Sequence, residues 1–397
     1  MRFLSESIAY LEKRVAGHLA RRDPEAALRL LATYMAEANK ISHRHRSRSI
    51  GSDRIDALCR TVGAAIAANA SAQALQIDPQ PMDLYIASQL AAGGGHTAVI
   101  GDFRAAQPGV EARLLITDSI DHRSKINPDV LARTGFDPET TQFLSEPSRT
   151  RRVEQLHGIL SGRNWRRIYL FTHPEDSVAI AAIQPDFASR TVFVHHSDQA
   201  PSLGSYIENA AHLDVTPFTY HCCKANTSRK KQGFAPICVR DRDASAPARP
   251  PPAKIGVTAS CGRPGKFNAS LSGAPTASYF DVIAEVLSAT SVTHIHIGAL
   301  DGNAKRQMLG ALRRRGVDAK RLLHLKSVPS LWQAMHDYNV DLYINSFPEP
   351  GARASVEVMG SATPVVWHIA SEPVRQIAGH MKYPEAATWT GVNELIR

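Results

Sequence analysis

The sequence has little of what disulfide-bonded, zinc-binding or membrane-spanning proteins need. Its five cysteines are an odd number and include no CxxC pair, which indicates neither a disulfide framework nor a local zinc motif. The adjacent Cys222 and Cys223 are interpreted as small buried residues. No stretch approaches the roughly 18 unbroken apolar residues that span a bilayer, and the start, MRFLSESIAYLEKRV, lacks a signal peptide's apolar core. We therefore expect a cytoplasmic protein.

Aromatic residues make up only 7% of the chain, and few of them lie among the basic clusters. Those clusters are scattered: HRHRSR (43–48), SRTRR (148–152), SRKK (228–231) and RRR (313–315). Because a nucleic-acid groove needs a continuous basic track, we interpret most of them as solvated surface and expect no nucleic acid. The net charge of +9 favours anionic partners. Two such partners are nucleotide phosphates and the anionic inner face of a membrane, and the charge does not decide between them.

The 397 residues exceed what one hydrophobic core usually serves, so we expect two packed domains. Residues 1–80 have helical periodicity, and Asp23 before Pro24 is typical of a helix start. Strand-like runs alternate with helix-like segments over 81–240 and again over 255–397, and the proline-rich stretch 241–254 between them is interpreted as a linker. The pattern predicts an α/β protein with an N-terminal helical segment and two doubly wound, Rossmann-like domains facing a cleft.

The strand-like runs fall into two sets. Those of the first domain are MDLYIASQL (82–90), GGGHTAVIGDF (93–103), ARLLITDS (112–119), RRIYLFTH (166–173) and RTVFVHHSD (190–198). Those of the second domain are KIGVTAS (254–260), THIHIGAL (293–300), RLLHLKS (321–327), VDLYINS (340–346) and TPVVWH (363–368). In such sheets ligands collect at the carboxyl ends of the strands.

The stretch FPEPGARASVEVMG (347–360) follows the VDLYINS strand and leads into a helix. A loop that enters a helix presents unpaired N–H groups and the positive end of the helix dipole, which suits an anion such as a diphosphate. Gly351 lets the backbone approach closely and Ser355 adds a hydroxyl. Glu349 lies in the loop and Glu357 about one turn into the helix, so both can accept hydrogen bonds from sugar hydroxyls. The tip of this helix comprises Ala352, Arg353 and Ala354.

This stretch resembles the nucleotide-sugar signature of retaining GT-B glycosyltransferases, two glutamates separated by seven residues and followed by a pattern like EAMAxGxPVV. Glu349 and Glu357 take the glutamate positions, and Pro364-Val365-Val366 takes the PVV. The resemblance implies that Glu349 contacts the donor sugar and takes part in catalysis, and that Glu357 contacts the ribose hydroxyls. Ala362 stands where the family usually has glycine, and Pro350-Gly351-Ala352 replaces the more common glycine–aromatic–glycine.

Further residues of the second domain follow the order of the same family. Arg263 and Lys266 resemble the basic pair that faces the donor diphosphate, where cations neutralise charge on the leaving group. The resemblance places Gly298 near the donor, and Val328 and Pro329 beside the nucleotide base. Retaining members often work without a metal, so we expect none, and no cofactor besides the nucleotide-sugar substrate.

In the first domain the glycine loop and one strand-end segment are the candidates. Gly94 and Gly95 suit close approach to phosphate or acceptor, and His96 is expected to line the cleft. His196 and Asp198 end a strand, and a histidine there suits proton transfer or a hydrogen bond to a sugar. Zinc chemistry is an alternative for the adjacent His195 and His196, but no third ligand lies at a metal spacing.

The sequence thus predicts a glycosyltransferase that moves a sugar from a nucleotide diphosphate donor to an acceptor on a glycan, lipid or protein, with retention and without metal. One alternative is a sugar-nucleotide or glycan-binding module on the same fold without turnover. Another is an enzyme such as an epimerase, which changes the sugar nucleotide and needs no acceptor. A nucleic-acid binder is the weakest reading.

Overall fold

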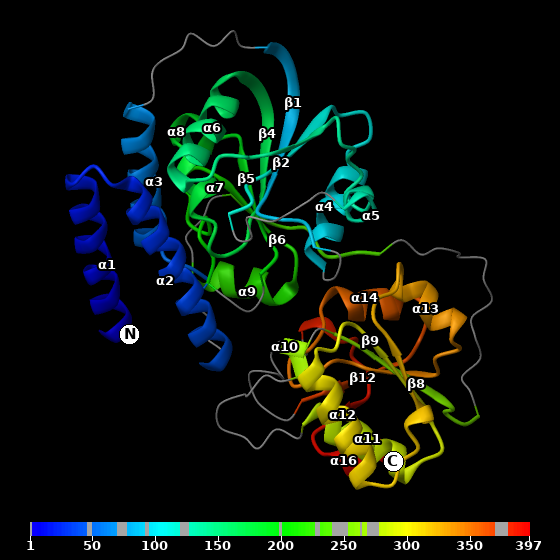
Figure 1. Cartoon of the computed structure of the whole chain (residues 1–397). Helices are drawn as coiled ribbons and strands as arrows, with labels where there is room; N and C mark the ends of the chain where they lie inside the picture. The colour runs from blue at the N-terminus through cyan, green and yellow to red at the C-terminus, as the bar shows by residue number, and fades with distance from the viewer. Residues whose placement is uncertain are drawn as a thin grey trace. The chain divides into compact units, whose positions relative to one another are not determined.

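The structure, a computed structural model, describes most of the chain. The described residues are 2–45, 50–69, 78–91, 95–119, 127–197, 201–226, 231–239, 253–262, 264–267, 278–369 and 380–397. The chain divides into two compact units, the first of residues 1–92 and 96–236 and the second of residues 93–95 and 237–397. Each unit holds one parallel sheet with helices (Figure 1), which confirms the predicted α/β class with two doubly wound domains. Most of the predicted linker, 241–254, lies outside the described residues.

The first unit is built around seven parallel strands in the order β3-β2-β1-β4-β5-β6-β7. The strands are β1 (Asp78–Ala87), β2 (Ala112–Ile116), β3 (Thr141–Phe143), β4 (Arg163–Phe171), β5 (Thr191–His195), β6 (Ala211–Asp214) and β7 (Gln232–Phe234). Four of them confirm predicted runs: β1, β2, β4 and β5. The order reverses between β1 and β4, and such a reversal opens a ligand-binding position at the carboxyl ends of the two strands.

Helices cover both faces of this sheet. They are α4 (Gly95–Ala105), α5 (Pro128–Ala132), α6 (Arg149–Ser161), α7 (Ser177–Ala182), α8 (Pro185–Ala188) and α9 (Pro217–Asn226). Side chains along β1 alternate between the faces, as a strand requires. Leu84 and Ile86 join the apolar core that includes residues of α6 and α7, whereas the Tyr85 ring stacks at 5.7 Å on Phe171, which also meets Phe103 of α4.

The strand-like interpretation of GGGHTAVIGDF is wrong, because the described part of this run, from Gly95, forms helix α4. Thr97 ties the first turn of α4 to the preceding chain, since its hydroxyl donates to the carbonyl of Ala91 and accepts from its N–H, both at 3.0 Å. Gly101 brings α4 against the carbonyl of Arg133, where a Cβ would lie 2.3 Å away. A short apolar run is compatible with a helix as well as with a strand. The contacts of Thr97 and Gly101 stabilise the helix in this case.

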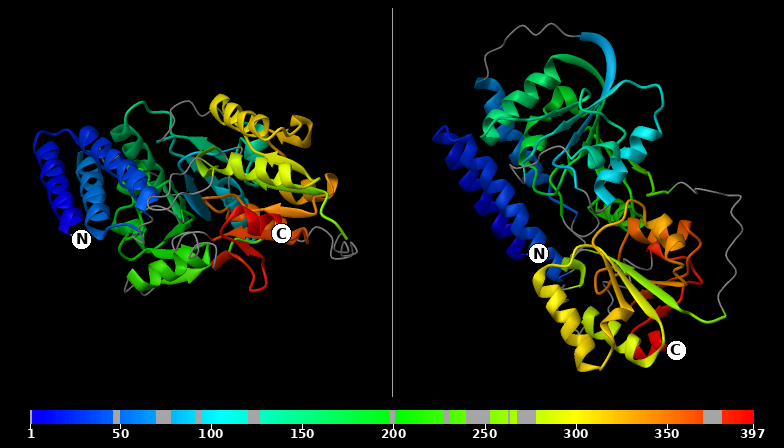
Figure 2. Two further views of the ribbon diagram at one scale, coloured as in Figure 1. Left: turned by 90° about the horizontal axis from the view of Figure 1, so that it is seen from below. Right: turned by 45° about the vertical axis from the view of Figure 1, so that its right-hand side comes forward.

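Three N-terminal helices, α1 (Arg2–Ala20), α2 (Pro24–His45) and α3 (Asp53–Asn69), pack together and over α6 and α7 (Figures 1 and 2). The predicted start of α2 is confirmed, because the Asp23 carboxylate accepts from the N–H of Ala26. Gly63 permits close packing of α3 on α7, since a Cβ there would lie 1.8 Å from the carbonyl of Ala181. Among the helices of the described residues, none has the length and apolar character needed to cross a membrane.

The second unit repeats the same arrangement with six parallel strands in the order β10-β9-β8-β11-β12-β13. The strands are β8 (Val257–Cys261), β9 (Thr293–Ile297), β10 (Leu322–Leu325), β11 (Leu342–Ile344), β12 (Val365–His368) and β13 (Thr388–Trp389). The first five confirm the five predicted runs of this domain. The reversal of strand order falls between β8 and β11, so the loops that follow these two strands meet at the switch point.

Two apolar layers hold helices against the two faces of this second sheet. One layer includes residues of α11 (Tyr279–Ala289), α12 (Gly302–Arg314) and α16 (Val392–Ile396). The other includes residues of α13 (Leu331–Asp337) and α14 (Arg353–Gly360). Short helical turns lie at α10 (Pro264–Phe267) and η1 (Ala319–Arg321). The Trp332 indole donates to the carbonyl of Gly360 at 2.9 Å, which ties α13 to the end of α14.

Ala362, where glycine is usual in the resembling family, adopts the backbone conformation of a glycine. It follows the end of α14 with φ of +59°, and its N–H donates to the carbonyl of Met359. A residue in the left-handed region is a common way to end a helix, and glycine is favoured there because a Cβ costs roughly 1–2 kcal/mol. The chain therefore keeps the glycine geometry at this helix end with an alanine.

Replacing Ala362 with glycine is expected to raise the free energy of unfolding by about 0.5–1 kcal/mol, because relief of the left-handed strain outweighs the extra entropy of the unfolded chain. The alanine is exposed, so the lost methyl group costs no buried contact. Urea denaturation measures the change. Ala319→Gly is the matched control: this exposed alanine of η1 has a negative φ, so glycine there should lower stability. Equal changes in both variants would contradict the strain argument.

Candidate functional site

The loops after β8 and β11 meet at the switch point of the second sheet and contact each other. Lys266, in the α10 turn after β8, donates from Nζ to the carbonyl of Pro350 at 3.0 Å. In return the N–H of Glu349 donates to the carbonyl of Lys266 at 3.4 Å. Two predicted donor-binding residues, Lys266 and Glu349, are therefore neighbours. Both residues follow strands at the switch point, where this type of sheet binds ligands.

A buried asparagine holds the β11–α14 loop in shape. Asn345 follows β11, and its Oδ1 accepts from the N–H of Gly351 and from the hydroxyl of Ser355, both at 3.1 Å. A Cβ on Gly351 would lie 3.0 Å from this Oδ1, which explains the glycine. The Asn345 Nδ2 group is buried without a hydrogen-bond partner in the described part of the chain. Asn345 was not predicted as a site residue, although a lone amide at the end of an apolar strand was the available signal.

The first turn of α14 lies directly behind this loop. Ala352 is the N-cap residue, and no side chain caps the helix there. The Ser355 hydroxyl donates to Asn345 and to the Gly351 carbonyl at 2.7 Å, so it turns toward the loop and leaves the helix tip uncapped by it. An N-terminus without a side-chain cap keeps its backbone donors and positive dipole end for a ligand. Ala352, Arg353 and Ala354 thus lie at a helix tip of the kind that binds phosphate.

The two glutamates differ in their surroundings. Glu349 is buried, with 6% of its surface exposed. Glu357 lies one turn into α14, half-buried, with its carboxylate 3.1 Å from Nε of Arg353. The sequence analysis did not foresee this ion pair, although the spacing of four residues along a helix allows it. Arg353 holds Glu357 in one orientation and adds a positive charge at the helix tip.

The other predicted donor residues lie on neighbouring strand-end segments or outside the description. Gly298 follows β9 with φ of +134°, and a Cβ there would lie 2.1 Å from the Gly262 carbonyl at the end of β8, so only glycine fits. Val328 is half-buried and Pro329 is exposed, just before α13. Arg263 lies outside the described residues, as do Gly94 and Asp198 of the first unit.

Three histidines gather at the switch point of the first sheet. His96 is the second residue of α4, His173 follows β4 and His196 follows β5. The ring of His96 lies 4.4 Å from that of His196 and 5.1 Å from that of His173. The structure thus brings together His96 and His196, which are far apart in sequence, and adds His173, which the sequence analysis did not single out. Gly95 precedes this group as the first residue of α4.

The hydrogen bonds of these histidines fix their tautomers. Nε2 of His96 donates to the carbonyl of Phe171 at 2.7 Å, so its Nδ1 carries the lone pair, and this atom is buried without a partner among the described residues. Nδ1 of His196 donates to the carbonyl of Val194 at 3.3 Å, which leaves Nε2 as the acceptor. A neutral imidazole with a nitrogen lone pair can accept a hydrogen bond from a sugar hydroxyl.

Burial keeps both imidazoles neutral. Burial, together with the neighbouring His173 and against the hydrogen bond that His96 donates to the Phe171 carbonyl, lowers the pKa of His96 to about 3. Burial also lowers the pKa of His196 well below its usual value, with His96 and His173 adding to the effect. Below neutral pH these side chains therefore still act as hydrogen-bond acceptors.

One group of side chains in the described residues could hold a metal ion: His195, His212, Asp214 and Cys223 of the first unit. Burial opposes ionisation of Asp214, but hydrogen bonds from His195 and His212 outweigh it and lower the pKa of this carboxyl. The group lies at the ends of β5 and β6, next to His196.

Neither a protein-family model nor a curated protein matches the sequence, whereas solved structures match the fold. The HepE protein of Anabaena in complex with UDP and glucose has a TM-score of 0.55 and 17% identity, covering 79% of this chain and 87% of that chain. A glycosyltransferase from Rickettsia africae has a TM-score of 0.56 and 10% identity, covering 80% and 86%. The UDP-GlcNAc 2-epimerase of Methanocaldococcus jannaschii, in complex with UDP-GlcNAc and UDP, has a TM-score of 0.50 and 8% identity, covering 80% and 91%. At these identities the likeness is one of fold: the chain has two Rossmann-like domains, as proteins of the GT-B fold do.

Proposed function

We propose that this chain is a glycosyltransferase that binds a nucleotide diphosphate sugar on its second unit and transfers the sugar to a hydroxyl or other nucleophile. One observation carries the proposal: the uncapped tip of α14 at the switch point of the second sheet, with Glu349, Glu357 and Lys266 around it. A helix tip and a lysine suit the two negative phosphates, and the carboxylates suit the hydroxyls of the two sugars.

The same elements suit the transfer step. The bond between the anomeric carbon and the diphosphate breaks, the bond to the acceptor oxygen forms, and the leaving nucleoside diphosphate takes the negative charge. The α14 dipole and Lys266 stabilise that charge where it develops. By the family resemblance we assign retention, with the departing phosphate helping to take the acceptor proton, and no metal at the diphosphate. Arg263, Gly298, Val328 and Pro329 complete the proposed donor site.

The comparisons support a nucleotide-sugar donor. The HepE structure contains UDP and glucose, and the epimerase structure contains UDP-GlcNAc and UDP. A uridine diphosphate sugar is therefore the first donor to test. The acceptor side is proposed for the first unit, where His96 at the start of α4 and His196 after β5 each carry a nitrogen lone pair.

The epimerase likeness supports a second candidate, a sugar-nucleotide epimerase on the same fold. An assay with isotope-labelled UDP-sugars separates the readings. Release of UDP with label moving to an added acceptor, or to water, supports transfer. A changed sugar still attached to UDP supports epimerisation. A donor that raises the melting temperature but is never consumed supports a binding module. No stabilisation by any nucleotide sugar would refute the proposal.

His196→Ala is expected to lower the transfer rate at least tenfold while leaving the affinity for the nucleotide unchanged, because its Nε2 accepts from the acceptor hydroxyl and the donor binds elsewhere. Initial rates and titration with UDP measure the two effects. His157→Ala is the matched control: this half-buried histidine of α6 packs against Phe187 rather than at a strand end. A wild-type rate in His196→Ala would remove the residue from the proposed acceptor site.

A further inference from the structure

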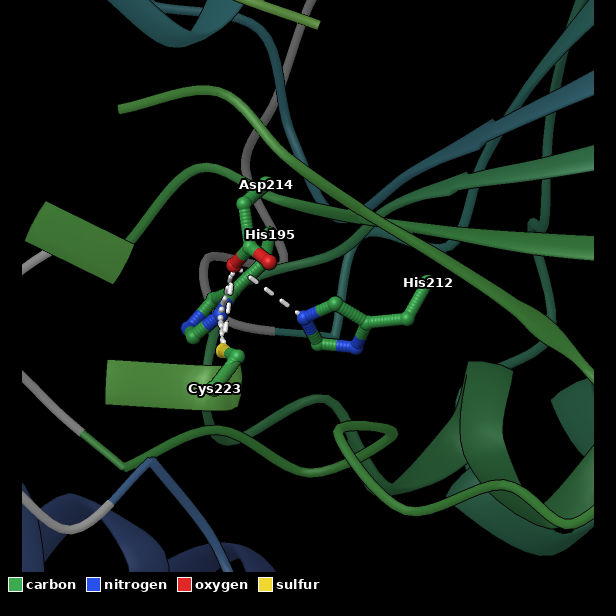
Figure 3. A group of neighbouring side chains, drawn as sticks. All are labelled: His195, His212, Asp214 and Cys223. Atoms are coloured by element: carbon green, nitrogen blue, oxygen red, sulfur yellow. Dashed lines mark hydrogen bonds and ion pairs between the residues drawn. The ribbon is translucent and has the colours of Figure 1, made fainter. Parts of the chain in front are cut away.

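Four buried side chains from three elements of the first unit point toward one another (Figure 3). His195 is the last residue of β5, and His212 and Asp214 lie on β6. Cys223 comes from α9, the helix that follows β6. Each residue has at most 1% of its surface exposed. None of them has a part in the proposed donor site, which lies in the second unit.

The ligand atoms of these residues form a compact group. Asp214 Oδ1 lies 3.2 Å from Nδ1 of His195, 3.2 Å from Nε2 of His212 and 3.0 Å from Sγ of Cys223. Nδ1 of His195 is also 3.2 Å from Sγ of Cys223. All four atoms lie within 4.8 Å of one another. A tetrahedral zinc ion with its usual bond lengths separates its ligand atoms by roughly 3.3–3.6 Å. The four distances above are shorter than this by a few tenths of an ångström, and the remaining separations, within 4.8 Å, contract by up to roughly 1 Å when the ion binds.

Hydrogen bonding alone is a poor explanation of the group. Three donors converge on the single oxygen Oδ1 of Asp214, although a carboxylate oxygen offers about two lone-pair sites. The one N–H of His195 is also equidistant from this oxygen and from the cysteine sulfur, and it cannot point at both. A cation at the centre removes the conflict, because each atom then directs a lone pair inward and the thiol becomes a thiolate.

The surroundings fit a metal site as well. The second carboxylate oxygen of Asp214 accepts from Nε2 of Gln232 on β7 at 2.9 Å. This amide also donates to the carbonyl of Tyr220 in α9, so one side chain fixes the carboxylate and the helix together. Such hydrogen bonds behind the ligands orient metal sites in proteins.

We propose that His195, His212, Asp214 and Cys223 bind one Zn²⁺ ion. Two imidazoles, a thiolate and a carboxylate are ligands that zinc takes in a tetrahedral site. With four protein ligands and no exposure, the site is closed, which is the pattern of a structural rather than a catalytic ion. The ion ties α9 to the ends of β5 and β6 and fixes the start of the segment that carries His196. These four ligands have no recognisable spacing in the sequence, because they come together only when β5, β6 and α9 pack.

Metal analysis of the full-length protein, with any affinity tag removed and zinc supplied during expression, is the direct test. We expect about one zinc per chain after dialysis, and a fall in melting temperature on chelation that added zinc reverses. Cys223→Ser is expected to lower the zinc content at least fivefold. Cys222→Ser is the matched control, because the adjacent cysteine is buried but has no place in the group, and it should keep its zinc.

Absorption spectroscopy with cobalt tests the proposal on the wild-type protein, so it does not depend on whether Cys223→Ser folds. Added to metal-free wild-type protein, Co²⁺ should give the thiolate charge-transfer absorption and the intense visible bands of a tetrahedral site. A wild-type zinc content below about a tenth per chain, another metal bound in stoichiometric amount, or equal zinc in the two cysteine variants would overturn the proposal. These readouts do not depend on sugar transfer, so the metal site and the proposed function can fail separately.

Discussion

Glu357→Ala is expected to weaken the binding of nucleotide by roughly ten- to a hundredfold, because a carboxylate hydrogen-bonded to ribose hydroxyls contributes about 1.5–3 kcal/mol. Glu349→Ala is expected to lower the transfer rate by about a hundredfold while changing nucleotide affinity by less than about threefold. The difference arises because the proposed contact of Glu349 is to the sugar, where charge changes during transfer, so its loss acts on the transition state. Calorimetric titration with UDP and initial rates of transfer measure the two quantities.

The ion pair of Glu357 with Arg353 needs its own control, since removing the carboxylate also changes the helix tip. Glu285→Ala provides it. Glu285 on α11 pairs with Nε of Arg315 at 2.6 Å in the same unit, so its loss removes a comparable ion pair away from the β11–α14 loop. Glu357→Gln keeps one acceptor oxygen and should fall between wild type and Glu357→Ala. If Glu349→Ala and Glu357→Ala both transfer sugar at the wild-type rate, the β11–α14 loop is not the donor site.

Most residues of the proposed donor site could be named from the sequence because they are neighbours along the chain. Glu349, Gly351, Ser355 and Glu357 lie on one strand–loop–helix segment whose apolar strand and helix start are both readable. Asn345 was missed because its role depends on hydrogen bonds to Gly351 and Ser355 that a pattern does not show.

The histidine group and the proposed zinc site are non-local, and this explains what the sequence analysis missed. His173 joins His96 and His196 only because β4 and β5 are neighbours in the sheet. β6, with the sequence AHLD, and β7, with the sequence QGF, are too short and too polar for a periodicity argument. His212 and Asp214 lie on β6 and Gln232 on β7, so the ligands could not be assembled before the strand order was known.

Lowering the pH from 6.5 to 5 is expected to destabilise both units strongly. Burial, with a histidine neighbour adding to it, lowers the pKa of His96 and His294 to about 3 and that of His296 to about 4, and it lowers the pKa of His196 well below 6.5. An unfolded histidine titrates near 6.5. As the pH falls below that value, the unfolded chain takes up protons that the folded chain does not, so the free energy of unfolding decreases.

The expected decrease in the free energy of unfolding is large because several buried histidines contribute to it. Each of these histidines contributes a loss of about 1.5 kcal/mol between pH 6.5 and pH 5, and two lie in each unit. A loss of about 3 kcal/mol per unit is a substantial part of the 5–15 kcal/mol that usually stabilises a domain. Urea denaturation at pH 7.5, 6.5, 5.5 and 5.0, followed by circular dichroism, gives the slope of the free energy of unfolding against pH.

The slope gives the number of protons that the chain takes up on unfolding. A variant that removes one buried imidazole therefore tests the contribution of that imidazole. The two ring nitrogens of His294 form hydrogen bonds with the hydroxyl groups of Thr258 and Tyr279 inside the second unit. His294→Gln keeps hydrogen-bonding capacity there but cannot take up a proton. The variant should lose some stability at pH 7.5. The number of protons that the second unit takes up when it unfolds, measured between pH 6.5 and 5, should nevertheless fall by about one. A free energy of unfolding that stays level from pH 7.5 to 5 in the wild-type protein would mean that these imidazoles protonate in the folded state. Their assignment as neutral hydrogen-bond acceptors, including that of His196 in the proposed acceptor site, would then be wrong.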